Sequence, residues 1–313
     1  MIENSPTGRS EKDSLLFQLG VAAAIVCSLV LIFELFVAIY RSPDVFGEIY
    51  DLISHILIIT PSPVSILALT GTAVQAFYVI VLISVILAVG YILFRFIPVL
   101  ISFFRNGETE SLRKSAMFEF GTVFAAIYFL QTAFIIVLMA VGVDIESTIP
   151  FQDETDLEMM FLTLQASVWE EIVSRVLLIG FPMLLIALIR SDREKWWKWL
   201  TGGFGMSQYA AALIILSAVF FGLAHVPGWD LWKFIPTFMF GLGVGYMFVK
   251  YGLYAAISMH FIFNYLSASD WLLNDGGAML GLAVLITALF GIPFVWVYLK
   301  RGISYLREEF IRA

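Results

Sequence analysis

Residues 159–189 read MMFLTLQASVWEEIVSRVLLIGFPMLLIALI, a run that is long and apolar enough to cross a membrane as a helix. A bilayer's hydrocarbon core takes about 20 apolar residues in helical form, and several other runs of the chain reach that length. The sequence has 313 residues, 60% hydrophobic and 14% charged, with a net charge of −7. We therefore predict an all-α fold, a polytopic membrane helix bundle of about eight transmembrane helices. This composition gives no support for nucleic-acid binding.

The apolar runs define the expected spans. They are residues 15–40, 73–94, 118–142, 159–189, 209–226, 234–250, 252–268 and 277–299. The intervening segment 41–72 has only a short apolar stretch, stopped by Pro61 and Pro63, which predicts a surface or re-entrant helix rather than a span. The first apolar run, of about 26 residues, is too long for the h-region of a cleavable signal, so we expect it to be the first span.

The basic residues predict the orientation of the chain in the cell membrane. If the amino terminus is cytoplasmic, 15 of the 18 Lys and Arg residues fall on the cytoplasmic side. Arg41 and Lys233 then lie outside, and Arg175 lies within a span. The positive-inside rule accordingly places both termini in the cytoplasm. The single cysteine, Cys27, excludes an intramolecular disulfide.

Three charged residues inside the span of residues 159–189 require a reason, because each costs about 3 kcal/mol on insertion scales. Glu171 and Arg175 are four residues apart, so they lie on one helical face and can pair. Glu170 is rotated by about 100 degrees from that face, which leaves it free to face a cavity. The alternative is a buried pair and a hydrated acid that only hold helices together.

Two of the three histidines also lie in apolar helices. Phe221 and His225, in FFGLAHV, and His260 and Asn264, in SMHFIFNY, are each four residues apart. Together with Glu170 they make an acid, two imidazoles and an amide in the carboxyl-terminal half of the chain, which can converge on one polar pocket.

Four other polar or small residues in or near the apolar runs are not assigned to this polar pocket. We expect His55 to be structural, whereas Glu34 is either a helix-packing or a portal residue. The spacing of Gly241 and Gly245 is typical of two helices in close contact.

The motifs EEIVSR, FGLAH and HFIFN, in this order, resemble the motifs EExxxR, FxxxH and HxxxN of the CAAX protease and bacteriocin-processing (Abi) family. This family includes the Ras-converting CAAX prenyl endopeptidases. The resemblance covers roughly residues 165–268. Together with the predicted spans, it divides the chain into four parts. These are a disordered cytoplasmic tail (1–14), amino-terminal transmembrane helices and loops (15–160), a family-like catalytic core (161–270), and a last transmembrane helix with a basic cytoplasmic tail (271–313).

The resemblance implies an intramembrane endopeptidase that acts on a membrane-associated, possibly prenylated protein. Peptide hydrolysis requires an activated water and a stabilised oxyanion. Glu170 and His225 suit the water, and His260 and Asn264 can donate hydrogen bonds to the oxyanion. The resemblance implies this same division of roles. Supporting positions are Glu171, Arg175 and Phe221.

Alternatives remain at this stage. We favour a site without a metal cofactor, but Glu170, His225 and His260 are also the ligand types of a catalytic zinc site. The HExxH spacing of zincins is absent. Other classes of function are a non-catalytic membrane scaffold or bacteriocin-immunity relative and a proton-linked transporter. The expected partners are membrane lipid and a lipidated or membrane-associated peptide or protein, and the sequence indicates no oligomeric state.

Overall fold

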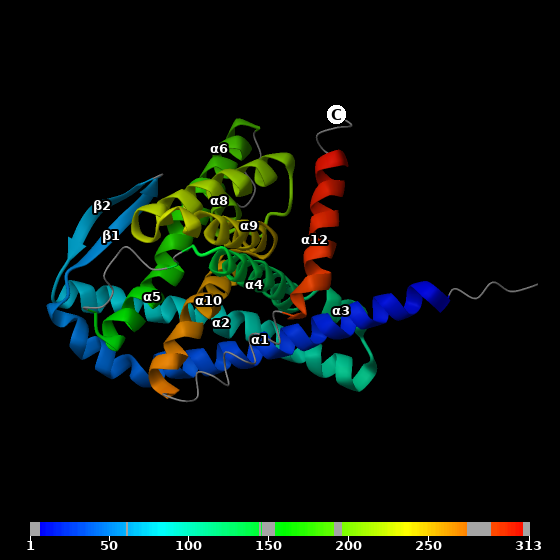
Figure 1. Ribbon diagram of the computed structural model, residues 1–313, viewed down its shortest axis with the longest axis horizontal. Helices are drawn as coiled ribbons and strands as arrows, with labels where there is room; N and C mark the ends of the chain where they lie inside the picture. The colour runs from blue at the N-terminus through cyan, green and yellow to red at the C-terminus, as the bar shows by residue number, and fades with distance from the viewer. Residues whose placement is uncertain are drawn as a thin grey trace, which may run out of the picture.

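A computed structural model of the chain describes residues 7–60, 62–143, 145, 154–190, 196–273 and 289–308. Six of its helices are long and apolar enough to cross a membrane, which makes the chain a multi-pass membrane helix bundle (Figure 1). The predicted all-α fold is thus confirmed. The six helical stretches are Leu15–Asp51, Thr72–Asn106, Ala116–Ala140, Asp156–Ile189, Gln208–Trp229 and Leu231–Tyr251.

The described elements divide between two halves of the chain. The first half contains α1 (Thr7–Glu48), the 3-10 turn η1 (Ile49–Asp51), β1 (Ser54–Thr60), β2 (Ser62–Leu69), α2 (Thr72–Asn106), α3 (Thr109–Arg113) and α4 (Ala116–Ala140). The second half contains α5 (Asp156–Glu171), the π-helix η3 (Ile172–Gly180), α6 (Phe181–Ile189), α7 (Trp196–Thr201), α8 (Gln208–Trp229), the 3-10 turn η4 (Leu231–Lys233), α9 (Phe234–Tyr251), α10 (Leu253–Leu273) and α12 (Gly291–Leu306).

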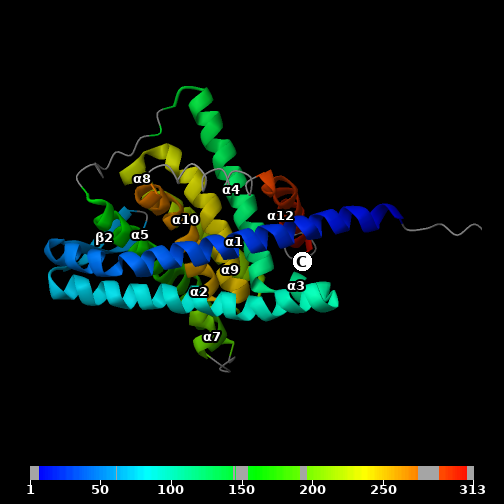
Figure 2. The same cartoon turned by 90° about the horizontal axis from the view of Figure 1, so that it is seen from below.

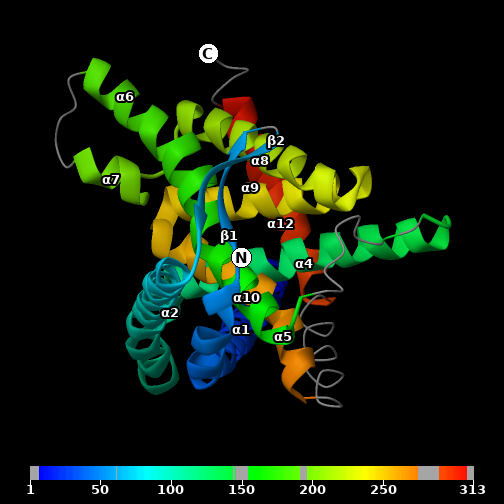
Figure 3. The same ribbon diagram turned by 90° about the vertical axis from the view of Figure 1, so that its left-hand side faces the viewer.

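The two long helices α1 and α2 lie side by side along the molecule (Figure 2). The β1–β2 hairpin connects them at the end of the molecule away from the start of α1, and it passes in front of α5 and α8 (Figure 3). In the rest of the bundle, α10 packs against α5 and α2, α8 packs against α9, and α12 packs on α4. The hairpin therefore lies beside the helix that carries WEEIVSR.

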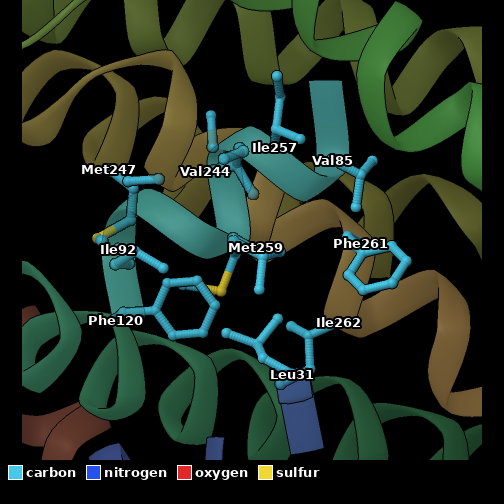
Figure 4. Packing of buried hydrophobic residues seen from close by; sticks show 14 of the residues in the cluster. Leu31, Val85, Ile92, Phe120, Val244, Met247, Ile257, Met259, Phe261 and Ile262 are labelled. Atoms are coloured by element: carbon cyan, nitrogen blue, oxygen red, sulfur yellow. The ribbon is translucent and has the colours of Figure 1, made fainter. Parts of the chain in front are cut away.

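Buried apolar side chains from most of the described helices fill the centre of the bundle, and Figure 4 labels those of five helices. Lipid tails are as apolar as these side chains, so close van der Waals packing rather than exclusion of water holds such helices together. The side chains labelled in the figure are Leu31 of α1, Val85 and Ile92 of α2, Phe120 of α4, Val244 and Met247 of α9, and Ile257, Met259, Phe261 and Ile262 of α10.

Glycines let α9 approach α8 closely. A Cβ atom built on Gly241 would lie 2.9 Å from the Cα of Ala218, and one built on Gly245 would lie 3.1 Å from Cγ2 of Ile214. The first of these distances is shorter than real Cβ contacts, so the two helices are in backbone contact at Gly241. This is the close packing that the spacing of the two glycines predicts.

The prediction of a surface or re-entrant helix within residues 41–72 is wrong. The first helix continues to Glu48, and residues 54–69 form an antiparallel hairpin with a bulge between Ile56 and Leu57. Isoleucine and threonine make up four of the seven residues of β1, and β2 adds Val64 and Ile66. These β-branched residues favour an extended backbone over a helix. A short apolar stretch that cannot span the bilayer therefore becomes a hairpin.

The first helix also starts earlier than predicted. It begins at Thr7, so residues 7–14 are helical rather than disordered. Glu11 and Lys12 are good helix formers, and residues added to an existing helix need no new nucleus. Residues 1–6 of the predicted tail lie outside the described residues.

The last two predicted spans are only partly described. The span 252–268 corresponds to α10, whose apolar part over Leu253–Leu266 is shorter than the six long helices. Most of the span 277–299 lies outside the described residues, and α12 begins near its end, at Gly291.

Candidate active site

Residues 156–189 form one continuous helix whose central turns are wide. Thr155 begins this helix with a capping box, because its hydroxyl and the Glu158 carboxylate each accept a hydrogen bond from the other residue's backbone N–H. Over Ile172–Gly180 the helix is π-helical, directly after the two glutamates of WEEIVSR. Such turns are often found at functional sites.

Glu171 is fully buried and is bound on both oxygens. Arg175 Nε donates to Oε2 at 3.0 Å, and His260 Nδ1 donates to Oε1 at 2.8 Å. The guanidinium also donates from Nη1 to the hydroxyl of Ser217 at 2.8 Å, and that hydroxyl donates to the carbonyl of Ser174 at 2.6 Å. The predicted pair of Glu171 and Arg175 is present, and it extends into a network that links α5, η3, α8 and α10.

Glu170 faces the two histidines. Its Oε2 atom lies 3.9 Å from Nε2 of His225 and 3.8 Å from Nε2 of His260. The side chains of Glu170 and His225 are 21% and 20% exposed, whereas that of His260 is 5% exposed. Within the described part of the chain, Oε2 of Glu170 has no hydrogen-bond partner.

The hydrogen bonds of the two imidazoles determine what they present to Glu170. Nδ1 of His225 lies 2.8 Å from the carbonyl oxygen of Phe221, which can only accept, so Nδ1 carries a proton. Nδ1 of His260 donates in the same way to the Glu171 carboxylate. In the neutral ring, each Nε2 is then an acceptor. Two imidazole lone pairs and one carboxylate oxygen thus converge on the same point.

Aromatic rings surround this polar group. The ring centroid of Phe221 lies 4.6 Å from that of His225, and its face lies 5.4 Å from the Arg175 guanidinium carbon. Phe240 of α9 packs edge-on against His260 with centroids 4.9 Å apart. Such rings fix the imidazoles in position, and they lower the local dielectric constant, which strengthens the charged interactions.

Asn264 points its amide towards α5. Its Nδ2 atom donates to the carbonyl of Thr163 at 3.1 Å and to the hydroxyl of Ser167 at 3.2 Å. Glu170, His225 and His260 therefore meet at their terminal atoms, while the amide of Asn264 joins α10 to the preceding two turns of the glutamate helix. Asn264 would have to release one of these bonds to donate to a substrate.

Several residues around the site were not predicted from the sequence. Ser217 is a polar residue in an apolar span, and this signal could have identified it. Phe240 has no such signal. Trp169 donates from Nε1 to the carbonyl of Leu57 at 2.7 Å, which attaches the hairpin directly beside Glu170. That contact depends on a hairpin the sequence analysis did not predict.

Two polar residues singled out from the sequence lie outside this group. His55 is exposed on β1, where Nδ1 lies 3.0 Å from the hydroxyl of Ser65 on β2. Glu34 is buried in α1, and neither of its carboxylate oxygens has a hydrogen-bond partner among the described residues.

The distances between the side chains of the site can be compared with those of a zinc site. Zinc bonds of 2.0–2.2 Å in tetrahedral geometry set ligand atoms about 3.4 Å apart. The two distances from Glu170 Oε2, 3.8 and 3.9 Å, are longer. In the described ranges, no three His, Cys, Asp or Glu side chains are grouped so as to hold a metal ion. Nδ1 of each histidine makes the kind of hydrogen bond that is common for zinc-bound histidines. The chemical types of these side chains therefore suit zinc better than the distances between them do.

Comparison with known proteins identifies the region that holds these residues. Residues 154–266 match the family described as type II CAAX prenyl endopeptidase Rce1-like. The chain carries a domain of this family. The match covers about a third of the chain, including all three motifs, and it confirms the family assignment made from them. Comparisons with curated proteins and with solved structures found no significant match.

Proposed function

We propose that this protein is an intramembrane endopeptidase that hydrolyses a peptide bond of a membrane-associated protein. The observation that carries the proposal is the convergence of Oε2 of Glu170 and Nε2 of His225, two hydrogen-bond acceptors, beside Nε2 of His260. Acceptors that face one another require protons between them, and a water molecule supplies two. The distances of 3.8 and 3.9 Å suit groups bridged by one water.

In the proposed reaction, the bridging water donates one hydrogen bond to Glu170 and one to His225. Glu170 takes a proton as the water oxygen attacks the peptide carbonyl, and it later returns this proton to the leaving amine. The developing oxyanion needs a donor, which His260 supplies from Nε2 when its ring is protonated. The Glu171 carboxylate, 2.8 Å from Nδ1, stabilises that imidazolium. Asn264 is a second candidate donor.

The family domain supports a membrane-associated substrate, and we propose a prenylated protein of the CAAX type as its class. The test is a cleavage assay with the purified full-length chain in liposomes. It compares a farnesylated peptide with a CAAX-type end and the same peptide without the lipid. We expect preferential cleavage of the farnesylated peptide.

The variant that tests the site is His225→Ala, and His55→Ala is its matched control. We expect His225→Ala to lose cleavage with an unchanged melting temperature, because the ring is partly exposed and holds water rather than the fold. His55→Ala removes a histidine outside the site and should retain activity. Full activity of a well-folded His225→Ala protein excludes the proposed role in water activation.

We further propose that the reaction needs no metal ion. Cleavage should then persist in the presence of chelators, and metal analysis of the active protein should find no stoichiometric zinc. Loss of activity on chelation with recovery on re-addition of zinc would assign Glu170, His225 and His260 as metal ligands instead.

A further inference from the structure

A polar cavity of about 350 Å³ is lined by none of the residues of the glutamate and histidine site. Its lining residues come from α1, α3, α4, α9 and α12, and α12 packs on α4 near the early part of α1 (Figures 1 and 2). It combines cationic and aromatic side chains. These are Arg113 of α3, Lys250 of α9, Arg301 of α12, Phe17 of α1, Phe118 of α4 and Tyr298 of α12.

The one acid that lines this cavity is already bound. Glu119 is buried and accepts hydrogen bonds from the hydroxyls of Tyr246 and Tyr251 and from the ammonium group of Lys250. Nη1 of Arg301 lies 3.6 Å from Oε1 of Glu119, beyond hydrogen-bond distance. Glu119 therefore binds Lys250 directly and forms a longer ion pair with Arg301, and both of its oxygens are occupied.

The two arginines remain available to a ligand. Arg113 lies over the ring of Phe17, with its guanidinium carbon 4.7 Å from the ring centroid, and Arg301 lies 5.6 Å from the centroid of Tyr298. Among the described residues, neither arginine donates a hydrogen bond to a carboxylate. Three cations and one carboxylate give the cavity an excess of positive charge. Planar guanidinium groups match the oxygens of a phosphate.

Apart from Thr122, the rest of the lining is apolar, from Leu16, Phe294 and Val297. A small inorganic anion would leave these side chains without a partner, whereas the start of an acyl chain would cover them. All three cations also belong to segments that the charge distribution assigns to the cytoplasmic side, where the leaflet carries anionic lipids. Basic pockets between transmembrane helices on that side bind lipid headgroups.

We propose that this cavity binds an anionic phospholipid, with Arg113 and Arg301 on the phosphate and the apolar side chains on the first part of an acyl chain. A volume of about 350 Å³ exceeds that of a bare phosphate and is at the lower end for organic ligands. The lipid would join α12 to α1 and α3 across a gap that protein side chains leave open.

The test measures lipid binding to the purified full-length chain in detergent, by native mass spectrometry and by the shift in melting temperature. The probes are phosphatidylglycerol, phosphatidylcholine and inorganic phosphate. The variant Arg113→Gln/Arg301→Gln is compared with Lys114→Gln/Lys300→Gln. The second pair removes the same charge from neighbouring residues that do not line the cavity. A third variant, Val297→Trp, fills the cavity without changing its charge.

We expect phosphatidylglycerol to bind and stabilise the wild-type protein in preference to phosphatidylcholine. The arginine variant should bind it about tenfold more weakly for each guanidinium group that no longer holds the phosphate, while the lysine variant should match the wild type. Val297→Trp should weaken binding as well. Equal loss in both double variants would mean attraction to surface charge only, and full competition by inorganic phosphate would mean a soluble anion. Either result overturns the proposed lipid site.

Discussion

At the scale of single residues, the two adjacent glutamates of WEEIVSR have opposite surroundings. Glu171 is fully buried between Arg175 and His260, so its charge is compensated on both oxygens. Glu170 is partly exposed, and its Oε2 atom has no hydrogen-bond partner in the described ranges. These surroundings support the proposal that Glu171 organises the site and that Glu170 acts on the substrate water.

We predict that Glu171→Gln and Glu170→Gln fail in different ways. Glu171→Gln leaves the buried guanidinium of Arg175 without its counter-charge, which costs about 3–5 kcal/mol and should appear as poor expression or a lower melting temperature. Glu170→Gln should give a stable, inactive protein. Thermal unfolding and cleavage rates of both variants check this. A stable, inactive Glu171→Gln protein beside an unstable Glu170→Gln protein would reverse the two roles.

Asn264 offers a second residue-scale prediction, because its amide binds α5 rather than the histidines in this structure. If it donates to the oxyanion during catalysis, Asn264→Ala should lower kcat about 100-fold to 1000-fold with little change in KM. Ser167→Ala is the control, since it removes one of the amide's partners and keeps the amide. Equal and small effects of both variants on kcat would show that Asn264 only joins helices.

At the scale of elements, the contact between α8 and α9 sets the position of His225. We predict that Gly241→Ala lowers the free energy of unfolding by about 1–3 kcal/mol, because its methyl group would lie against the backbone of Ala218. Gly90 is the control. A Cβ atom there meets nothing within 4 Å, so Gly90→Ala should be neutral or slightly stabilising. Similar melting temperatures for the two variants would contradict the close helix contact.

The α-helices could be predicted from the sequence, whereas the β-hairpin and the π-helix could not. A run of apolar residues is a local signal, and the bilayer requires helices wherever such a run is long enough. The hairpin over residues 54–69 also has a local signal, its β-branched residues, but its place beside α5 depends on the contact of Trp169 with Leu57. The π-helix over Ile172–Gly180 has no spacing signal, because Glu171 and Arg175 are paired in it as in an α-helix.

At the scale of the whole molecule, the site is assembled from three helices that are distant in sequence. Spacing within each motif predicted the pairs Glu171 with Arg175 and Phe221 with His225, because each pair spans one turn. Spacing could not predict that His260 would bind Glu171, since that contact depends on how α10 packs against α5. The pairs within each motif were therefore predictable, whereas the way in which the motifs meet required the tertiary structure.

The orientation of the bundle is the remaining whole-molecule prediction, and it decides which side of the membrane supplies the substrate. With both termini cytoplasmic, the site lies in the outer half of the bilayer, although prenylated proteins are processed on the cytoplasmic side. Two variants, each with one added cysteine, can locate the ends of the helices. Gly302 has no neighbouring atom within 4 Å of a built Cβ, and Leu231 is 69% exposed.

We expect a membrane-impermeant thiol reagent to label Leu231→Cys on intact cells and Gly302→Cys only after permeabilisation, because the positive-inside rule places these positions on opposite sides. The native Cys27 is buried, so the wild-type chain gives the background. The reverse labelling pattern would invert the bundle. Inversion would bring Glu170 and His225 into the cytoplasmic half of the membrane, and it would favour a prenylated substrate over one that approaches from outside.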